Sequence, residues 1–199
     1  MSLAKNEFKV LYALLKAPGA SQRDIAAAAN VSLGAANKAL ACLSELGYVD
    51  EGRVTAAGMS ALAPYKVTNA VIMAAGLSSR FAPISYEKPK GLLRVRGEIL
   101  IERQIEQLKE AGVDDIIVVV GYKKEYFFYL EEKYGVHIVV NRDYASRNNN
   151  STLWMVKEVL DNTYICSSDD YFTENPFESH VWKAYYAVQY QDGKTKEWC

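Results

Sequence analysis

Apolar residues in the first third of the chain recur at the spacing of short amphipathic helices. Ser21 is a favourable N-cap for a helix over residues 22–29, with Asp24 at the position of a capping-box acid. Ser32 is a similar cap for a helix over residues 33–46. An earlier helix is predicted from an apolar face made by Phe8, Leu11, Leu14 and Leu15.

A small antiparallel ribbon is predicted after these helices. A short strand at residues 48–50 and a return at residues 54–55 flank the tight turn Glu51-Gly52-Arg53, and a last helix is expected over residues 56–62. Three helices followed by such a wing resemble the winged helix-turn-helix of MarR-type regulators. The segments that carry the resemblance are residues 21–26, 31–32 and 43–49.

The pattern changes near residues 63–66, where β-branched runs begin to alternate with helical spacing. Strands are predicted over residues 70–73, 116–120, 136–140 and 164–167, and the helices between them over residues 123–134 and 152–160 and around Ile101, Ile105 and Leu108. This alternation predicts a mostly parallel sheet in a Rossmann-like three-layer α/β domain. We therefore divide the chain into a winged helix domain, residues 1–66, and an α/β domain, residues 67–199.

Composition excludes several classes of protein. The 199 residues carry 23 Lys and Arg against 24 Asp and Glu, a formal net charge of -1, so the chain as a whole is no polycation. Three widely spaced cysteines indicate neither a disulfide framework nor a zinc site, which fits a reducing cytosol. No apolar run approaches the roughly 20 residues of a membrane span. We expect a cytoplasmic protein without membrane insertion.

Small residues fill the loop after the first predicted strand of the α/β domain. Gly76 in this loop can take positive φ, so that successive backbone N–H groups face phosphate oxygens, and Arg80 adds a fixed forked charge. Lys88-Pro89-Lys90 follows and supplies two more cations. An ordinary glycine turn and a solvated basic turn are the alternative interpretations. The loop is neither GxGxxG nor a P-loop, so a dinucleotide cofactor is not indicated.

Two adjacent carboxylates, Asp169 and Asp170, follow an apolar strand. Like charges at this spacing are costly without a cation, and Mg²⁺ prefers one or two carboxylates together with substrate phosphates. Ligands of parallel sheets bind at the carboxyl ends of the strands, where the small-residue loop also lies. A magnesium site is therefore predicted there, with an exposed acidic turn as the alternative.

The string Ala74-Ala75-Gly76-x-x-Ser79-Arg80, followed by Pro89-Lys90, resembles the signature of the sugar-phosphate nucleotidyltransferase superfamily. The resemblance implies that Arg80 and Lys90 are catalytic cations, with Lys90 the principal one. It also implies that a loop wraps the nucleotide, made of Ala74, Ala75, Gly76, Leu77, Ser78, Ser79 and Arg80.

The same resemblance extends to the acidic pair and has two departures. It implies that Asp169 binds Mg²⁺ and that Asp170 contacts metal-bound water or the acceptor. The superfamily often has Gly where Ser78 stands, and Thr or a small residue where Lys88 stands. Ser78 is expected to fit the tight loop and Lys88 to face solvent.

A narrower resemblance, to bacterial CTP:phosphocholine cytidylyltransferases of the LicC type, runs through the α/β domain. Gly121, Asn148 and Asn149 belong to it, and it places them at the nucleotide; Asn can read a base edge or hold a ribose. The alternative is that residues 147–150 form a polar turn. The other segments that carry this resemblance are residues 122–124, 134–136, 141, 153 and 156–158.

Aromatic residues are frequent between residues 171 and 198. A quaternary ammonium has no N–H to donate, so aromatic faces are the groups able to hold it. Tyr171 and Trp198 are the candidates for such a cage. The alternation from Trp182 to Tyr190 instead predicts one face of a strand, with most of these side chains in the core.

The implied reaction transfers CMP from CTP to phosphocholine, giving CDP-choline and pyrophosphate with Mg²⁺. A sugar-1-phosphate nucleotidyltransferase is the rival among enzymes. A transcription regulator that uses the α/β domain to sense a nucleotide or CDP-choline is the rival from another class. The transferase domain of the resembled family continues beyond Cys199, so a truncated domain is expected, whose acceptor pocket is incomplete.

For the winged helix domain, the residues expected to reach DNA are Asn37 and Lys38 near the start of the recognition helix and Arg53 at the tip of the wing. These residues form a small basic surface for a DNA-binding protein. A homodimer would double it. A structural or protein-docking role is the alternative.

Overall fold

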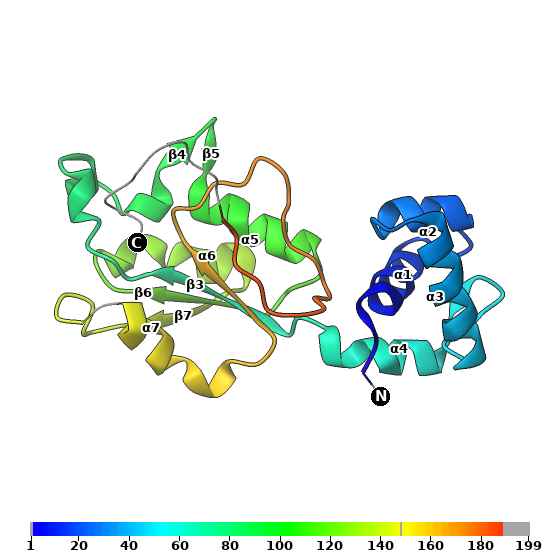
Figure 1. Ribbon diagram of the computed structural model, residues 1–199. Helices are drawn as coiled ribbons and strands as arrows, with labels where there is room; N and C mark the ends of the chain where they lie inside the picture. Colours follow the sequence, from blue (N-terminus) through cyan, green and yellow to red (C-terminus); the bar gives the residue numbers. More distant parts are fainter. Residues whose placement is uncertain (1, 148, 189–199) are drawn as a thin grey trace.

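The computed structural model describes residues 2–147 and 149–188. It has a helical N-terminal part and an α/β part, joined by the 3-10 turn Ala63–Tyr65. Figure 1 shows the two parts side by side, with helix α1 on the side that faces the sheet. No helix among the described residues is long and apolar enough to cross a membrane.

The N-terminal part is the predicted winged helix. Its elements are α1 (Lys5–Lys16), α2 (Gln22–Ala28), α3 (Leu33–Glu45), the antiparallel pair β1 (Val49–Asp50) and β2 (Arg53–Val54), and α4 (Ala56–Leu62). Ser21 and Ser32 cap α2 and α3 as predicted, each accepting from the backbone N–H three residues on. Asp24 differs from a capping-box acid: its carboxylate accepts from the Ser21 hydroxyl at 2.7 Å.

The α/β part is built on a parallel sheet with strand order β7-β6-β3-β8. Its strands are β3 (Asn69–Ala74), β6 (Ile116–Val120), β7 (His137–Val140) and β8 (Thr163–Ser167), with a separate hairpin of β4 (Arg94–Val95) and β5 (Glu98–Ile99). The helices between them are α5 (Leu100–Glu110), α6 (Tyr129–Tyr134) and α7 (Asn149–Met155). The predicted alternation of strands and helices is therefore confirmed, and the hairpin turns at Gly97 with φ 90°.

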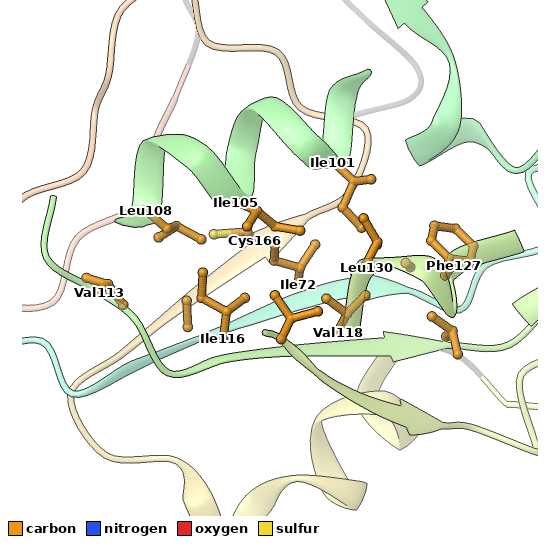
Figure 2. Packing of buried hydrophobic residues seen from close by; sticks show 14 of the residues in the cluster. Ile72, Ile101, Ile105, Leu108, Val113, Ile116, Val118, Phe127, Leu130 and Cys166 are labelled. Atoms are coloured by element: carbon orange, nitrogen blue, oxygen red, sulfur yellow. The ribbon is translucent and has the colours of Figure 1, made fainter. Parts of the chain in front are cut away.

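The main core lies between α5 and the sheet. Figure 2 shows the apolar side chains of α5 over those of β3 and β6, with Phe127 and Leu130 completing the cluster. The opposite face carries α7 and a smaller cluster around Val71, Val119 and Val156. This two-sided burial explains why β3 and β6 are almost continuous apolar runs.

Two predicted helices are shorter in the structure. The segment expected as one helix over residues 123–134 splits into a 3-10 turn, Lys124–Phe127, and α6, because Lys123 takes a left-handed conformation (φ 51°) and a run of four aromatic residues follows Glu125. The helix expected to reach residue 160 ends at Met155, and a 3-10 turn, Lys157–Val159, follows.

The strand expected from Trp182 onward is wrong for the described residues of that stretch, 182–188, which form no strand. Tyr186 and Val188 are 92% and 77% exposed, so they are not core residues. Trp182 packs instead against the core of the winged helix, and its indole N–H donates to Leu3 O at 3.3 Å. Of this alternating series, Trp182 is therefore explained by a contact with another part of the chain, while Tyr186 and Val188 face solvent.

This returning segment joins the two parts. Ser179 O accepts from Val67 N–H at 2.9 Å, and Val181 N–H donates to Tyr65 O at 2.8 Å. The Tyr12 hydroxyl on α1 accepts from Ser179 N–H at 3.2 Å and lies 3.1 Å from Ser179 Oγ. In Figure 1 the segment, orange to red, runs between the sheet and α1. It holds the winged helix against the α/β part.

Tyr12→Phe is expected to lower the free energy of unfolding by about 1–2 kcal/mol, because the Ser179 N–H would lose its partner. Urea unfolding followed by far-UV circular dichroism measures the change. Tyr48→Phe is the matched control, since its hydroxyl has no recorded hydrogen bond among the described residues, and its effect should stay within about 0.5 kcal/mol. Equal effects of the two substitutions would contradict this role of Tyr12.

Candidate active site

The loops that carry the predicted chemistry meet at one edge of the sheet. Strands β3, β6 and β8 are parallel neighbours, so the segments after Ala74, Val120 and Ser167 leave the sheet at the same edge. Met73 and Ser167 are paired in the register of β3 and β8. The basic loop and the acidic pair, about eighty residues apart in sequence, are therefore adjacent.

Lys90 and Asp169 contact each other directly at this edge. The Lys90 ammonium donates to Asp169 Oδ2 and lies 4.9 Å from the centroid of the Phe81 ring. The two side chains are 33% and 27% exposed, so a ligand can reach both. The structure thus brings together the predicted catalytic cation and the predicted metal ligand.

The charge state of Asp169 follows from this contact. Partial burial raises the pKa of the carboxyl, but the hydrogen bonds from the Lys90 ammonium and the Ser167 hydroxyl outweigh that effect and lower it. Asp169 is therefore ionised at neutral pH. Partial burial, and then the neighbouring Asp169, raise the pKa of Asp170.

Close backbone packing fixes the acidic loop beneath Lys90. Ser168 N–H donates to Met73 O at 3.1 Å, and a Cβ on Gly91 would come within 2.8 Å of Ser168 Oγ. Gln104 of α5 is 1% exposed and donates to Ser167 O at 3.1 Å. Sequence reasoning missed Gln104, although a polar residue among Ile101, Ile105 and Leu108 on one helix face was a readable signal.

The small-residue loop differs in one respect from the prediction. Ala74 and Ala75 are buried, and Gly76, Leu77, Ser79 and Arg80 are exposed. The positive φ stands at Ser78 (53°), and Gly76 is not among the residues with positive φ. The left-handed residue is thus the one at which the resembled superfamily often has glycine. Lys88 is exposed, as predicted.

Gly76 nevertheless has open space beside it. A Cβ on Gly76 would meet no atom of the described residues within 4 Å, so none of them requires glycine there. Arg80 is exposed, and no ion pair is recorded for it among the described residues. The backbone at Gly76 can be approached closely, and the Arg80 guanidinium has no recorded ion-pair partner in the described part of the chain. Together they are suited to bind an anionic ligand.

Gly121 supports this loop from below. A Cβ there would lie 2.7 Å from Ala75 O and 2.6 Å from Tyr144 Cβ, so only glycine allows the end of β6 to pack under the loop. Gly121 also lines an open cleft of about 290 Å³ at the ends of β6 and β7, together with Asn141. Asn141 is 1% exposed and donates to Thr152 Oγ1 at 3.1 Å. The side chains of Asn148 and Asn149, predicted at the nucleotide, lie outside the described part of the chain.

The donors after β8 fit a magnesium ion carried by a phosphate ligand. Asp169, Asp170 and the Ser167 hydroxyl supply oxygen atoms, and Asp169 already holds a cation in the form of the Lys90 ammonium. Among the described residues no three acidic, His or Cys side chains gather as a metal cage. Mg²⁺ needs no such cage, because phosphates and water complete its shell.

The residues predicted to bind the acceptor differ in how accessible they are. Asp170 is exposed at the edge. Tyr171 has one ring face taken by the Arg103 guanidinium at 5.0 Å, and its hydroxyl donates to Glu98 at 3.0 Å. Arg103 also donates to the carbonyls of Phe172 and Thr173, which holds this segment on α5. Because Arg103 covers one face of its ring, Tyr171 offers at most one free face to a ligand. Trp198 lies outside the described residues.

The three predicted DNA-contacting residues are exposed. Asn37 and Lys38 lie on the outer face of α3, and Arg53 lies in the wing. Figure 1 shows α3 and the wing on the side away from the sheet, while α1 faces the sheet. The α/β part therefore leaves this surface open.

Gly121→Ala is expected to lower the free energy of unfolding by about 1–3 kcal/mol, because its Cβ would overlap a backbone oxygen. Gly76→Ala is the matched control and should change stability by no more than about 0.5 kcal/mol. Thermal and urea unfolding of both variants measure the difference. An unchanged free energy of unfolding in Gly121→Ala would contradict the packing of β6 under the loop.

Comparison with known proteins places the chain in a family. The family model of the MobA-like NTP transferase domain matches residues 70–191, and the winged helix-turn-helix DNA-binding model matches residues 3–50. The choline-phosphate cytidylyltransferase of Streptococcus pneumoniae is 46% identical over 129 residues, 65% of this chain and 56% of that protein. The 2-aminoethylphosphonate cytidylyltransferase of Lancefieldella rimae is 42% identical over 135 residues, 66% of this chain and 55% of that protein.

A solved structure points the same way. The CTP:phosphocholine cytidylyltransferase of Streptococcus pneumoniae matches with a TM-score of 0.55 at 49% identity, over 56% of this chain and 49% of that one. The chain spans about half the length of the curated relatives it matches. The transferase model covers more than half of the chain and includes the whole sheet edge at which Lys90 meets Asp169, and the chain belongs to the family of MobA-like NTP transferase domains.

Proposed function

We propose that residues 67–199 are the nucleotide-binding part of a magnesium-dependent cytidylyltransferase that converts CTP and phosphocholine into CDP-choline and pyrophosphate. The observation that carries the proposal is the contact of Lys90 with Asp169 at the carboxyl edge of the sheet, beside an open small-residue loop. Relatives 46% and 42% identical to the chain are named as cytidylyltransferases, which favours CTP over other nucleotides.

The reaction is an in-line displacement. A phosphate oxygen of the acceptor attacks the α-phosphorus of CTP, the bond between the α-phosphorus and the bridging oxygen breaks, and pyrophosphate leaves. No covalent enzyme intermediate is needed, so the protein acts by alignment and charge neutralisation. Lys90 and Arg80 stabilise the negative charge that develops on the phosphates.

Lys90 has to change partner for this role. In the structure its ammonium is held by Asp169. A triphosphate offers Lys90 oxygens of higher charge, and Asp169 would then be free to hold Mg²⁺ together with Asp170 and phosphate oxygens. When bound, the metal would neutralise the phosphates and orient the leaving group. Metal and nucleotide are therefore expected to bind together more tightly than either alone.

The acceptor is the finer part of the proposal. Phosphocholine and 2-aminoethylphosphonate both join an acidic phosphorus group to a cationic nitrogen. Of these two nitrogens only the primary ammonium can donate hydrogen bonds, for example to Asp170 or Glu98, whereas a quaternary ammonium needs aromatic faces. Tyr171 has one face covered by Arg103, and Phe172 and Phe177 pack edge-on against each other. Sugar-1-phosphates remain the third class of acceptor to be compared.

The protein is expected to release pyrophosphate from CTP with phosphocholine faster than with 2-aminoethylphosphonate or sugar-1-phosphates. Lys90→Ala and Asp169→Ala should each lower turnover by about 10²-fold or more, since each removes a fixed charge. Lys88→Ala, an exposed cation two residues from Lys90, should keep turnover near wild type. Preference for another acceptor would correct the substrate, and near-normal turnover of both charge variants would overturn the assigned roles.

For the winged helix domain, we propose DNA binding through the outer face of α3 and the wing. The family model that matches residues 3–50 and the exposure of Asn37, Lys38 and Arg53 support this role. Two charged residues make a small phosphate footprint, so affinity should be low, should fall only gently with salt and should gain from two copies bound side by side.

Gel shifts at low salt with the promoter region of its own gene test this surface. Lys38→Ala with Arg53→Ala is expected to abolish the shift, because both phosphate-contacting cations are removed. Lys88→Ala with Lys124→Ala removes the same charge from the α/β part and should leave the shift in place. An identical loss in both double variants would mean that net charge alone attracts DNA, and no shift at micromolar protein would exclude the proposed surface.

A further inference from the structure

Lys123 stands at an unusual place in the backbone. It follows Gly121 and Tyr122 after β6 and has φ 51° and ψ 41°, the left-handed conformation that a residue with a Cβ adopts only at an energetic cost. Its carbonyl accepts from Tyr126 N–H at 3.1 Å, which begins the 3-10 turn Lys124–Phe127. An unfavourable backbone conformation of this kind is typical of residues whose side chain has a specific role at that position.

The side chain of Lys123 contacts the basic loop, the segment of residues 78–90 that carries Arg80, Lys88 and Lys90. Its ammonium donates to Tyr86 O at 2.5 Å and to Glu87 O at 3.3 Å. It also lies 5.6 Å from the ring centroid of Tyr122 and 5.5 Å from that of Tyr126, so two aromatic rings flank the cation on its own side. Two backbone carbonyls and two rings leave the ammonium little freedom to turn elsewhere.

Few other hydrogen bonds tie the middle of the basic loop to the rest of the fold. Among the described residues, the other hydrogen bonds recorded for residues 79–88 join the loop to itself, as in Tyr86 N–H to Pro83 O and Glu87 N–H to Ile84 O. The loop is tied to the sheet at its start, where Tyr122 N–H donates to Ala75 O, and at its end, through Lys90 and Asp169. Lys123 contacts the loop at Tyr86 and Glu87, between these two attachment points.

We propose that Lys123 is a positioning residue that holds the loop of residues 78–90, and with it Arg80 and Lys90, at the carboxyl edge of the sheet before a nucleotide binds. Its ammonium is the donor that ties two carbonyls of this loop to the segment after β6. The part of this inference that concerns nucleotide affinity rests on the proposed function; the part that concerns the order of the loop does not.

Hydrogen–deuterium exchange of the nucleotide-free 199-residue chain tests the order of the loop. Lys123→Met removes the ammonium, and the amides of Tyr86, Glu87 and Lys88 should exchange about tenfold faster or more. Lys123→Gly also removes the ammonium but favours the left-handed backbone, so it should show the same loss even if Lys123→Met folds poorly. Lys123→Arg should restore most of the protection.

Lys124→Met is the matched control for loop order. Lys124 is exposed and has no hydrogen bond or ion pair recorded among the described residues, so its replacement should leave the exchange of the loop unchanged. Unchanged protection of the loop in both Lys123→Met and Lys123→Gly would overturn the proposal. Equal loss in Lys124→Met would do the same, because it would show a general effect of charge.

Calorimetry with CTP and Mg²⁺ then separates this inference from the proposed function. A loosened loop with CTP affinity lowered several-fold, and recovered in Lys123→Arg, supports both. A loosened loop in a chain that never binds CTP supports the positioning role and rejects the nucleotide. Lower CTP affinity with an unchanged loop would mean that Lys123 touches the nucleotide directly, which overturns the positioning role.

Discussion

The ion pair between Lys90 and Asp169 is the contact on which the candidate site depends. It joins the loop after β3 to the loop after β8, two segments that meet only because the strands are parallel neighbours. The strand order β7-β6-β3-β8 decides this meeting, and the close fit of Gly91 on Ser168 fixes its distance. A cation and a carboxylate held together in this way neutralise each other, and they can exchange partners when a metal and a phosphate arrive together.

Local chemistry made much of the fold predictable. Ser21 and Ser32 begin helices because a hydroxyl can satisfy a free N–H at a helix end, and that rule depends on neighbouring residues alone. The run at residues 116–120 had to be a buried strand, since all five side chains are apolar and β-branched. Predicted strand ends and acidic or small-residue loops then placed the site at the carboxyl edge.

Features that depend on distant contacts were not predictable in the same way. The role of Gly121 comes from Ala75 and Tyr144, which reach it only in the folded state. The aromatic alternation after Trp182 fitted a strand, but its first side chain packs on the core of the winged helix. Tyr171 fitted an aromatic cage, but Arg103 of α5 covers one of its faces. In each case a residue far away in sequence decides what the side chain does, and periodicity carries no information about that residue.

Backbone strain distinguishes the candidate site from the rest of the fold. Five non-glycine residues have positive φ among the described residues, and three of them, Asn30, Glu51 and Arg96, lie at a helix end or in a hairpin turn that calls for it. The other two are Ser78 and Lys123, which lie on the two loops that enclose the sheet edge. Such a conformation persists only where the surroundings hold it. For Lys123 they do so through its hydrogen bonds to the other loop. The strain is therefore located at the place where the protein has to present cations to a ligand.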